Sequence, residues 1–284
     1  MAGNGESSTK VALITGGASG MGLATVKRLV ELGWNVSVLD YNKATGEAVA
    51  KELGDQVQFF HVDTANYDQH AKAFETTWKK FHRLDFVWQN AGIGDRIDFY
   101  APVEAADDAP PPKPNIDVMT VCLDAMVYGA YLALHYFRKN PSKGGKLLFT
   151  SSMCGLFPGT GIPLYTAAKH GVVGLTRALS AQLAKRNEPI TVNCLCPGLV
   201  DTGLTPALMA AAPTNVVTPP STIVRAVEEV LNEEGLTGMA LECSVQNIHR
   251  RTQQEYGDEN TAFLFGDYFV TALDRETLKA RAPK

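Results

Sequence analysis

Short apolar runs alternate with longer helical patterns along nearly the whole chain, and this alternation restricts the fold more than any other feature. The runs with the length and apolar composition of buried strands are 10–15, 35–40, 56–63, 84–90, 145–152, 190–198 and 238–245. The helical patterns between them cover 20–33, 43–53, 67–82, 116–140, 163–187 and 221–233. Strands that alternate with helices form a parallel sheet with right-handed crossovers and with helices on both faces. We therefore predict one doubly wound α/β domain with a seven-stranded, mostly parallel sheet.

Two segments interrupt the alternation. Residues 93–115 are acidic and contain "PPPKP", which fits neither a helix nor a central strand. This insertion is either a substrate lid or a tolerated surface loop. Residues 246–284 follow the last predicted strand, and their apolar patch is expected to pack on the same subunit or on a partner subunit. The remaining residues, 1–245, are expected to form the dinucleotide-binding and catalytic domain.

Composition excludes several classes of function. The formal net charge is −4 and the basic residues are scattered, which argues against a nucleic-acid partner. The five cysteines include no C-x-x-C pair and have no histidine cluster beside them, so we predict no metal site and no disulfide framework. The polar N-terminus does not resemble a signal peptide, and no apolar run is long enough to cross a membrane. A cytoplasmic protein is expected.

A glycine-rich turn joins the first predicted strand to the first predicted helix. Glycine tolerates positive φ and lets backbone N–H groups approach a phosphate, while the helix directs its positive N-terminus toward that phosphate. At the first strand–helix junction this pattern predicts a dinucleotide site. The residues of the turn expected to bind the cofactor are Gly16, Ser19, Gly20, Met21 and Gly22.

Later strand ends supply further candidate cofactor contacts. Asp40 ends the second strand, where a carboxylate accepts hydrogen bonds from the adenosine ribose and repels a 2′-phosphate, so NAD is favoured over NADP. Lys43 lies close enough to keep NADP as the alternative. Asp63 ends the third strand and is either an adenine contact or the N-cap of the next helix. The fourth strand ends in small residues suited to a wall along the ribose: Asn90, Ala91 and Gly92.

Tyr165 and Lys169 are four residues apart in a helical pattern, so they share one face of a helix. An ammonium group near a phenol stabilises the phenolate, and the pKa of Tyr165 is therefore expected to be lowered. Such a phenol can serve as a general base. Ser152 ends the fifth strand, and a hydroxyl there could hold a substrate oxygen opposite the tyrosine.

Five motifs together resemble the classical short-chain dehydrogenase/reductase family, which has a Rossmann-type fold. They are T-G-x-x-x-G-x-G at 15–22, N-A-G at 90–92, Ser152, Y-x-x-x-K at 165–169 and P-G at 197–198. The resemblance spans roughly residues 8–245. The stretches "YTAAKHGVVGLTR" and "CLCPGLVDT" are similar to the hydroxyprostaglandin-dehydrogenase-like branch and to fungal secondary-alcohol dehydrogenases such as hydroxyaverantin dehydrogenase.

The resemblance implies a role for each matching position. Tyr165 would be the acid/base, Lys169 would hold the nicotinamide ribose and tune Tyr165, and Ser152 would position the substrate oxygen. The residues that would line the nicotinamide are Pro197, Gly198, Val200 and Thr202. Cys122 departs from the pattern, because the family usually carries an asparagine there that supports a proton relay.

The expected activity is NAD-dependent interconversion of a hydrophobic secondary alcohol and its ketone. The alternatives are an NADPH-dependent ketoreductase of a biosynthetic pathway and a cofactor-binding cyclase or scaffold with little redox activity. The loops expected around the substrate are 93–117, 153–163 and 199–220. A hydrophobic substrate is favoured because they supply many apolar residues and few charges, and the alternative is that these residues pack among themselves. The family resemblance further implies a homodimer or homotetramer.

Overall fold

The computed structural model describes residues 9–103, 108–204 and 206–268. The chain divides into two compact units, Met1–Arg251 and Thr252–Lys284. The first unit carries every residue of the candidate site and is described first.

The first unit is built on a sheet with strand order β10-β9-β6-β5-β4-β1-β2-β3. Its strands are β1 (Val11–Thr15), β2 (Asn35–Asp40), β3 (Val57–His61), β4 (Phe86–Gln89), β5 (Gly145–Thr150), β6 (Ile190–Pro197), β9 (Ala240–Ser244) and β10 (Asn247–Arg251). Every neighbouring pair is parallel except β9 and β10. The predicted doubly wound α/β fold is confirmed.

The sheet has eight strands, whereas seven were predicted. The extra strand β10 folds back antiparallel on β9 through a tight turn in which Val245 has a φ of 52°. Most of its residues are exposed. A polar edge strand needs no apolar alternation, which explains why the sequence pattern missed it.

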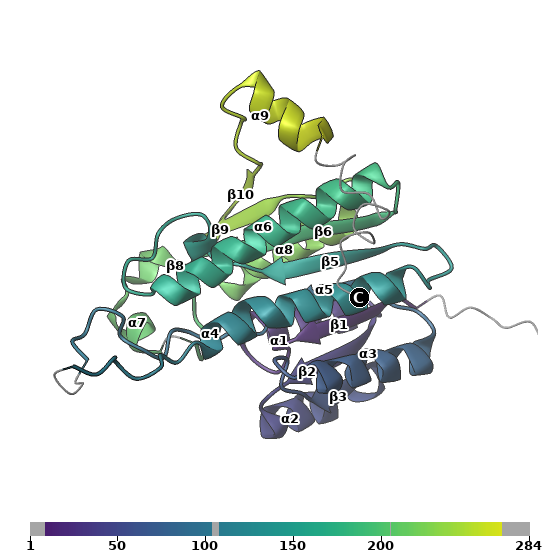
Figure 1. Ribbon diagram of the computed structural model, residues 1–284. Helices are drawn as coiled ribbons and strands as arrows, with labels where there is room; N and C mark the ends of the chain where they lie inside the picture. Colours follow the sequence, from purple (N-terminus) through teal and green to yellow (C-terminus); the bar gives the residue numbers. More distant parts are fainter. Residues whose placement is uncertain (1–8, 104–107, 205, 269–284) are drawn as a thin grey trace, which may run out of the picture. The chain divides into compact units, whose positions relative to one another are not determined.

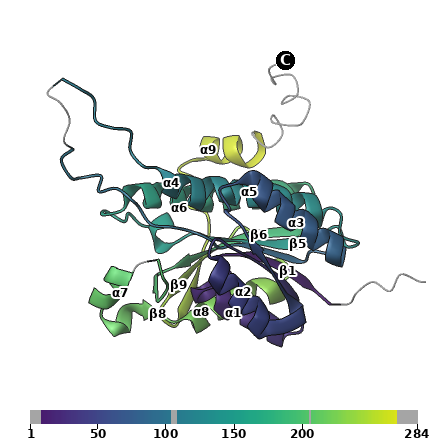
Figure 2. The same ribbon diagram turned by 90° about the horizontal axis from the view of Figure 1, so that it is seen from below.

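Helices cover both faces of the sheet, as Figures 1 and 2 show. One face carries α3 (Tyr67–Phe81), α5 (Ala125–Phe137) and α6 (Pro163–Lys185), and the other carries α1 (Gly20–Glu31), α2 (Lys43–Leu53) and α8 (Pro220–Asn232). The expected helix 116–140 is interrupted. It consists of α4 (Asp117–Met119), a π-helical turn η2 (Thr120–Asp124) and α5.

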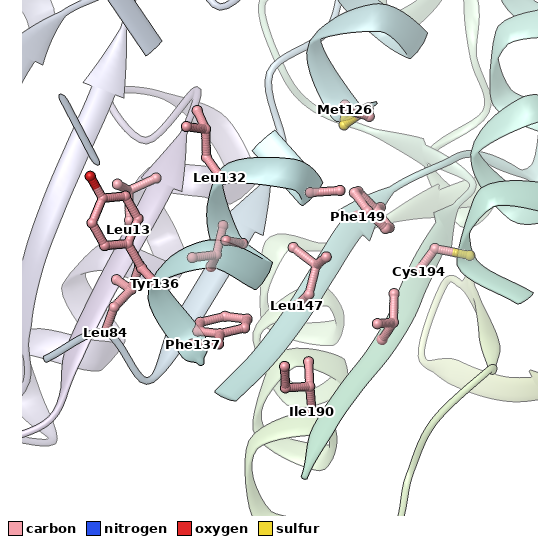
Figure 3. Packing of buried hydrophobic residues seen from close by; sticks show 14 of the residues in the cluster. Leu13, Leu84, Met126, Leu132, Tyr136, Phe137, Leu147, Phe149, Ile190 and Cys194 are labelled. Carbon is pink, nitrogen blue, oxygen red and sulfur yellow. The ribbon is translucent and has the colours of Figure 1, made fainter. Parts of the chain in front are cut away.

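Alternate residues of the central strands point to opposite faces of the sheet and belong to two apolar cores. Along β1, Val11 and Leu13 belong to the core beneath α3, α5 and α6, whereas Ala12 and Ile14 belong to the core on the opposite face. Figure 3 shows the first core, where Phe137 of α5 lies beside Leu147 of β5. Burial on both faces accounts for the nearly continuous apolar runs in the sequence.

The helical stretch Asp117–Phe137 is long and apolar enough to cross a membrane by length and composition, although no such run was expected from the sequence. Within α5, side chains such as Met126, Ala133 and Phe137 are buried against the sheet. This burial is the pattern of a core helix.

Short elements follow the carboxyl ends of the strands near β6. A small parallel pair, β7 (Leu199–Val200) and β8 (Val217–Thr218), flanks α7 (Pro206–Ala211) and the 3-10 turn η4 (Thr214–Val216). Another 3-10 turn, η3 (Met153–Gly155), follows β5, and a third, η1 (Gly54–Gln56), precedes β3. The loops of η3 and α7 are two of those expected around a substrate.

The second unit is described from Thr252 to Tyr268. It contains α9 (Glu259–Phe263), which begins where the Asp258 carboxylate accepts the Thr261 N–H at 2.7 Å, and a π-helical turn η5 (Leu264–Tyr268). The predicted packing of the tail stays a prediction. Residues 269–284 of the tail and 104–107 of the insertion lie outside the described residues.

Candidate active site

The glycine turn between β1 and α1 has the geometry of a phosphate cradle. Gly16 and Gly20 have φ angles of 64° and 51°, which disfavour other residues. A Cβ placed on Gly22 would lie 2.1 Å from the carbonyl oxygen of Gly16, so only glycine fits where α1 crosses the turn. Ser19 is exposed at the helix N-cap, and Met21 packs against the core beneath α1. The predicted residues are thus gathered at one helix N-terminus.

Asp40 lies at the carboxyl end of β2, next to this turn. Its Oδ2 accepts the Ala18 N–H at 3.0 Å, and its Oδ1 accepts the Asn42 N–H at 2.9 Å. Each carboxylate oxygen can accept further hydrogen bonds. The side chain therefore shapes the glycine turn, and its carboxylate lies at the edge of that turn.

Asp63 is not the N-cap of α3, so that alternative is wrong. The N-cap is Asn66, whose Oδ1 accepts the Gln69 N–H. Asp63 forms a local turn instead, because its Oδ1 accepts the Ala65 N–H at 3.0 Å. Its adenine contact stays a prediction.

Asn90 is the centre of a buried network at the end of β4. Its Nδ2 donates to the Gly16 carbonyl at 3.2 Å, and its Oδ1 accepts from the Thr150 hydroxyl at 3.0 Å. The Thr15 hydroxyl oxygen accepts the N–H groups of Asn90 and Ala91 at 2.8 and 3.0 Å. These bonds lock the N-A-G segment to the glycine turn.

The last residues of β1 and β5 were missed as site residues. Thr15 and Thr150 each end a buried strand, and their hydroxyls hold Asn90 from two sides. Thr150 also accepts the indole N–H of Trp88 at 3.0 Å. One sequence signal could have identified these two residues. Each is a threonine at the end of an otherwise apolar strand, next to a glycine or serine motif.

Ser152, Tyr165 and Lys169 come together at the carboxyl end of β5, as predicted. Lys169 is buried, its Nζ donates to the Thr150 carbonyl at 2.8 Å, and the same Nζ lies 5.3 Å from the Tyr165 ring centroid. The Ser152 side chain lies within interaction range of the Tyr165 phenol, whose pKa it acts to lower. The neighbouring Ser151 hydroxyl donates to the Lys169 carbonyl at 2.8 Å, which ties α6 to the strand end.

The predicted direction of the Tyr165 pKa shift is wrong for the protein without a bound cofactor. Burial raises the pKa of Tyr165 above its usual value, although Lys169 and the Ser152 side chain both oppose that rise. The sequence showed the ammonium group four residues away but not the loss of water around the phenol. Desolvation disfavours the charged phenolate, and here it outweighs one nearby cation.

Cys122 lies inside the π-helical turn η2 and is fully buried. Its Sγ accepts the Ile93 N–H at 3.4 Å and donates to the Ile93 carbonyl at 3.3 Å. A Cβ on Gly92 would lie 3.4 Å from this sulfur and 3.6 Å from the Lys169 Nζ, so the thiol and the ammonium group both border Gly92. Cys122 therefore fixes the backbone that follows N-A-G.

The segment after β6 closes over the glycine turn. The Gly198 N–H donates to the Cys243 carbonyl at 2.9 Å, which follows directly from the parallel register of Pro197 with Cys243. The Thr202 methyl group would lie 2.9 Å from a Cβ on Gly20. Val200 is buried in β7. Pro197, Gly198, Val200 and Thr202 thus follow one another from the end of β6 to the phosphate cradle.

These residues fit a dinucleotide. The glycines let the backbone come close at the N-terminus of α1, where a pyrophosphate would be bound, and Asp40 follows β2 where a ribose would be held. In the part of the chain that the structure describes, no cluster of three metal-ligating side chains is found.

Three comparisons agree with this geometry. A family model described as short chain dehydrogenase matches residues 10–212. The short-chain dehydrogenase/reductase prx6 of Penicillium rubens is 35% identical over 81% of this chain and 78% of its own length. Human 15-hydroxyprostaglandin dehydrogenase [NAD(+)] is 31% identical over 69% of this chain and 70% of its own length.

A solved structure agrees as well. The 3-ketoacyl-(acyl-carrier-protein) reductase from Brucella melitensis complexed with NADH superposes with a TM-score of 0.68 at 28% identity, covering 83% of this chain and 96% of its own. The family model alone covers more than half of the chain, and the motifs that it matches lie at one site. The chain belongs to the short-chain dehydrogenase/reductase family and is an oxidoreductase of the kind that binds a nicotinamide cofactor.

Proposed function

We propose that this protein is an NAD-dependent dehydrogenase that interconverts a hydrophobic secondary alcohol and its ketone, with Tyr165 as the general acid/base. The observation that carries the proposal is the position of the buried Lys169 ammonium group, 5.3 Å from the centroid of the Tyr165 ring, together with the Ser152 side chain, which acts to lower the pKa of the same phenol. A phenol between a hydroxyl and a cation can exchange a proton with a substrate oxygen.

Each group of the site has a separate task. The Ser152 hydroxyl holds the substrate oxygen, and the Tyr165 oxygen takes its proton during oxidation and returns it during reduction. Lys169 lowers the pKa of Tyr165 against the effect of burial, and the Thr150 carbonyl keeps the ammonium group in place. The nicotinamide, when bound, supplies the acceptor for the carbinol hydride.

Asp40 supports NAD rather than NADP. Its two bonds to backbone N–H groups keep the carboxylate at the edge of the glycine turn, where a 2′-phosphate would meet a negative charge. Lys43, the nearest basic residue in sequence, has its Nζ 3.7 Å from Glu47. An NADPH-dependent ketoreductase remains the second candidate, since the structural neighbour is a reductase, but that neighbour is complexed with NADH.

Apolar side chains support a hydrophobic substrate. Phe157 is exposed after β5, and Leu204 and Leu208 are exposed between β7 and β8. No charged side chain of 153–163 accompanies them. The family resemblance supports a homodimer or homotetramer and a role in secondary metabolism. The sequence pattern supports a cytoplasmic location, since it resembles no signal peptide.

The test is NADH formation with a panel of hydrophobic secondary alcohols. Tyr165→Phe should lose at least about a hundredfold in kcat, because general base catalysis contributes that much. Tyr67→Phe, which removes a phenol from α3 outside the site, is the matched control and should keep full activity. Equal turnover by Tyr165→Phe and the parent would refute the acid/base role. Binding of NAD without turnover of any alcohol or ketone would favour a scaffold or cyclase.

A further inference from the structure

The helix that carries Tyr165 lacks an N-terminal cap of its own. Its N-cap residue is Ile162, which has no side-chain acceptor, and its first residue is Pro163, which has no N–H. The next two backbone N–H groups, those of Leu164 and Tyr165, have no carbonyl partner within the helix. A polar partner therefore has to come from outside the helix.

Asp95 supplies that partner from the insertion after β4. Its Oδ1 accepts the Tyr165 N–H at 2.6 Å, and its Oδ2 accepts the Leu164 N–H at 3.2 Å. The two residues are 70 positions apart in sequence. A carboxylate at a helix N-terminus also interacts favourably with the helix dipole.

Asp95 is itself held by contacts on both sides. Two residues earlier, the Ile93 backbone exchanges two hydrogen bonds with the Cys122 thiol. Five residues later, the Tyr100 hydroxyl donates to the Thr160 carbonyl at 2.6 Å. The segment 93–100 is therefore fixed to η2 at one end and to the loop before α6 at the other.

The first turn of α6 needs this support more than the rest of the site. Lys169 is anchored twice at β5, through its Nζ and through its carbonyl. Tyr165 lies one turn earlier, and the bond to Asp95 is the one that its own backbone N–H makes. Loss of that bond would let the phenol shift relative to Lys169 and Ser152.

We propose that Asp95 is a positioning residue, which caps α6 from the insertion and sets the place of the Tyr165 phenol. The proposal rests on the proposed acid/base role of Tyr165. The proposal also gives residues 93–100, the first part of the insertion, a function in the site. This function does not depend on whether the rest of the insertion is a substrate lid or a surface loop.

Asp95→Ala tests the proposal, and Asp108→Ala is the matched control. Asp108 is an exposed carboxylate of the same insertion, and it lies outside the segment 93–100. In Asp95→Ala we expect kcat to fall about 10- to 100-fold, as a small misplacement of a catalytic group does, with unchanged affinity for NAD. Asp95→Asn, which keeps one acceptor oxygen, should lie between the parent and Asp95→Ala.

A rescue variant separates capping from general damage to the fold. Asp95→Ala combined with Ile162→Asp places a carboxylate at the N-cap of α6, from which it can accept the same N–H groups. Recovery of most of the lost kcat is expected. A melting temperature lowered in Asp95→Ala, with an unchanged kcat, would overturn the positioning role.

Amide hydrogen exchange gives a reading that needs no substrate. The Leu164 and Tyr165 amides should exchange roughly tenfold faster in Asp95→Ala, whereas the centre of α6 should be unaffected. Unchanged exchange at these two amides would overturn the proposal. If the parent turned over no alcohol or ketone, the proposed function would fail, yet the exchange result would still decide whether Asp95 caps the helix.

Discussion

The Cys122 thiol holds both the N–H and the carbonyl of Ile93, at Sγ distances of 3.4 and 3.3 Å. This residue stands where the family resemblance implies an asparagine. A thiol is a weak hydrogen-bonding group, but the Cys122 side chain is fully buried, and its two bonds link η2 to the segment after β4. Cys122 therefore keeps the backbone beside Gly92 and Lys169 in position, whether or not it serves a proton relay.

Cys122→Ala should lower the free energy of unfolding by about 1–2 kcal/mol, because it leaves a small cavity and removes two backbone partners. It should also lower kcat, since Ile93 precedes Asp95 by two residues. Cys243→Ala removes the same volume from the core beneath α1 and α8 and is the control: it should cost similar stability at full kcat. Urea unfolding and steady-state kinetics give both values, and an unchanged kcat in Cys122→Ala would contradict the link to the site.

Much of the site could be predicted because its residues lie at strand ends or share one helix face. Ser152, Tyr165 and Lys169 came together for this reason. Asp95 could not be predicted in the same way, since no local rule connects it to a helix that begins 68 positions later. The only sequence signal was negative: "IP" at 162–163 offers no capping side chain.

The predictions that failed concern features that depend on burial and on contacts between distant parts of the chain. The rise in the pKa of Tyr165 depends on how much water the surrounding chain excludes, which no pair of residues reveals. The strand β10 depends on its pairing with β9 rather than on its own polar composition. The apolar pattern of 116–140 predicted one continuous helix, whereas the structure has a π-helical turn at Cys122.

Lys169→Met should move the activity to higher pH. Lys169 lowers the pKa of Tyr165, so its removal leaves burial unopposed and raises that pKa further. Oxidation requires the deprotonated phenol, and its rise with pH should therefore begin at a higher pH, with kcat about a hundredfold lower at neutral pH. Lys185→Met, at the exposed end of the same helix, is the control. A pH–rate profile that did not move would contradict the electrostatic role of Lys169.

Asp40→Asn should weaken NAD binding about tenfold and narrow the preference for NAD over NADP. The amide group can accept at one atom only, so one of the Ala18 and Asn42 N–H groups loses its partner, and the charge that repels a 2′-phosphate disappears. Calorimetric titration with both cofactors measures the two effects. Asp55→Asn, an exposed change elsewhere on the first unit, should leave both affinities unchanged. Equal NAD affinity in Asp40→Asn and the parent would count against the ribose contact.

His70 should make stability depend on pH between about 4 and 6.5. Burial in α3 lowers the pKa of His70 from 6.5 to about 4, so over this window the unfolded chain binds a proton that the folded chain does not. The contribution is fully present above pH 6.5 and is lost as the pH falls toward 4, by up to about 3 kcal/mol.

Replacing the imidazole isolates this contribution. His70→Leu places an apolar side chain of similar size beside Phe74. The free energy of unfolding of this variant should therefore decline less steeply on acidification than that of the parent. His249→Asn, which removes an exposed imidazole from β10, should retain the steep decline. Urea unfolding at a series of pH values between about 4 and 7 gives the three slopes. If the His70→Leu slope matched the parent slope, the acid sensitivity would have to come from carboxylates, which lose their charge over the lower part of the same range.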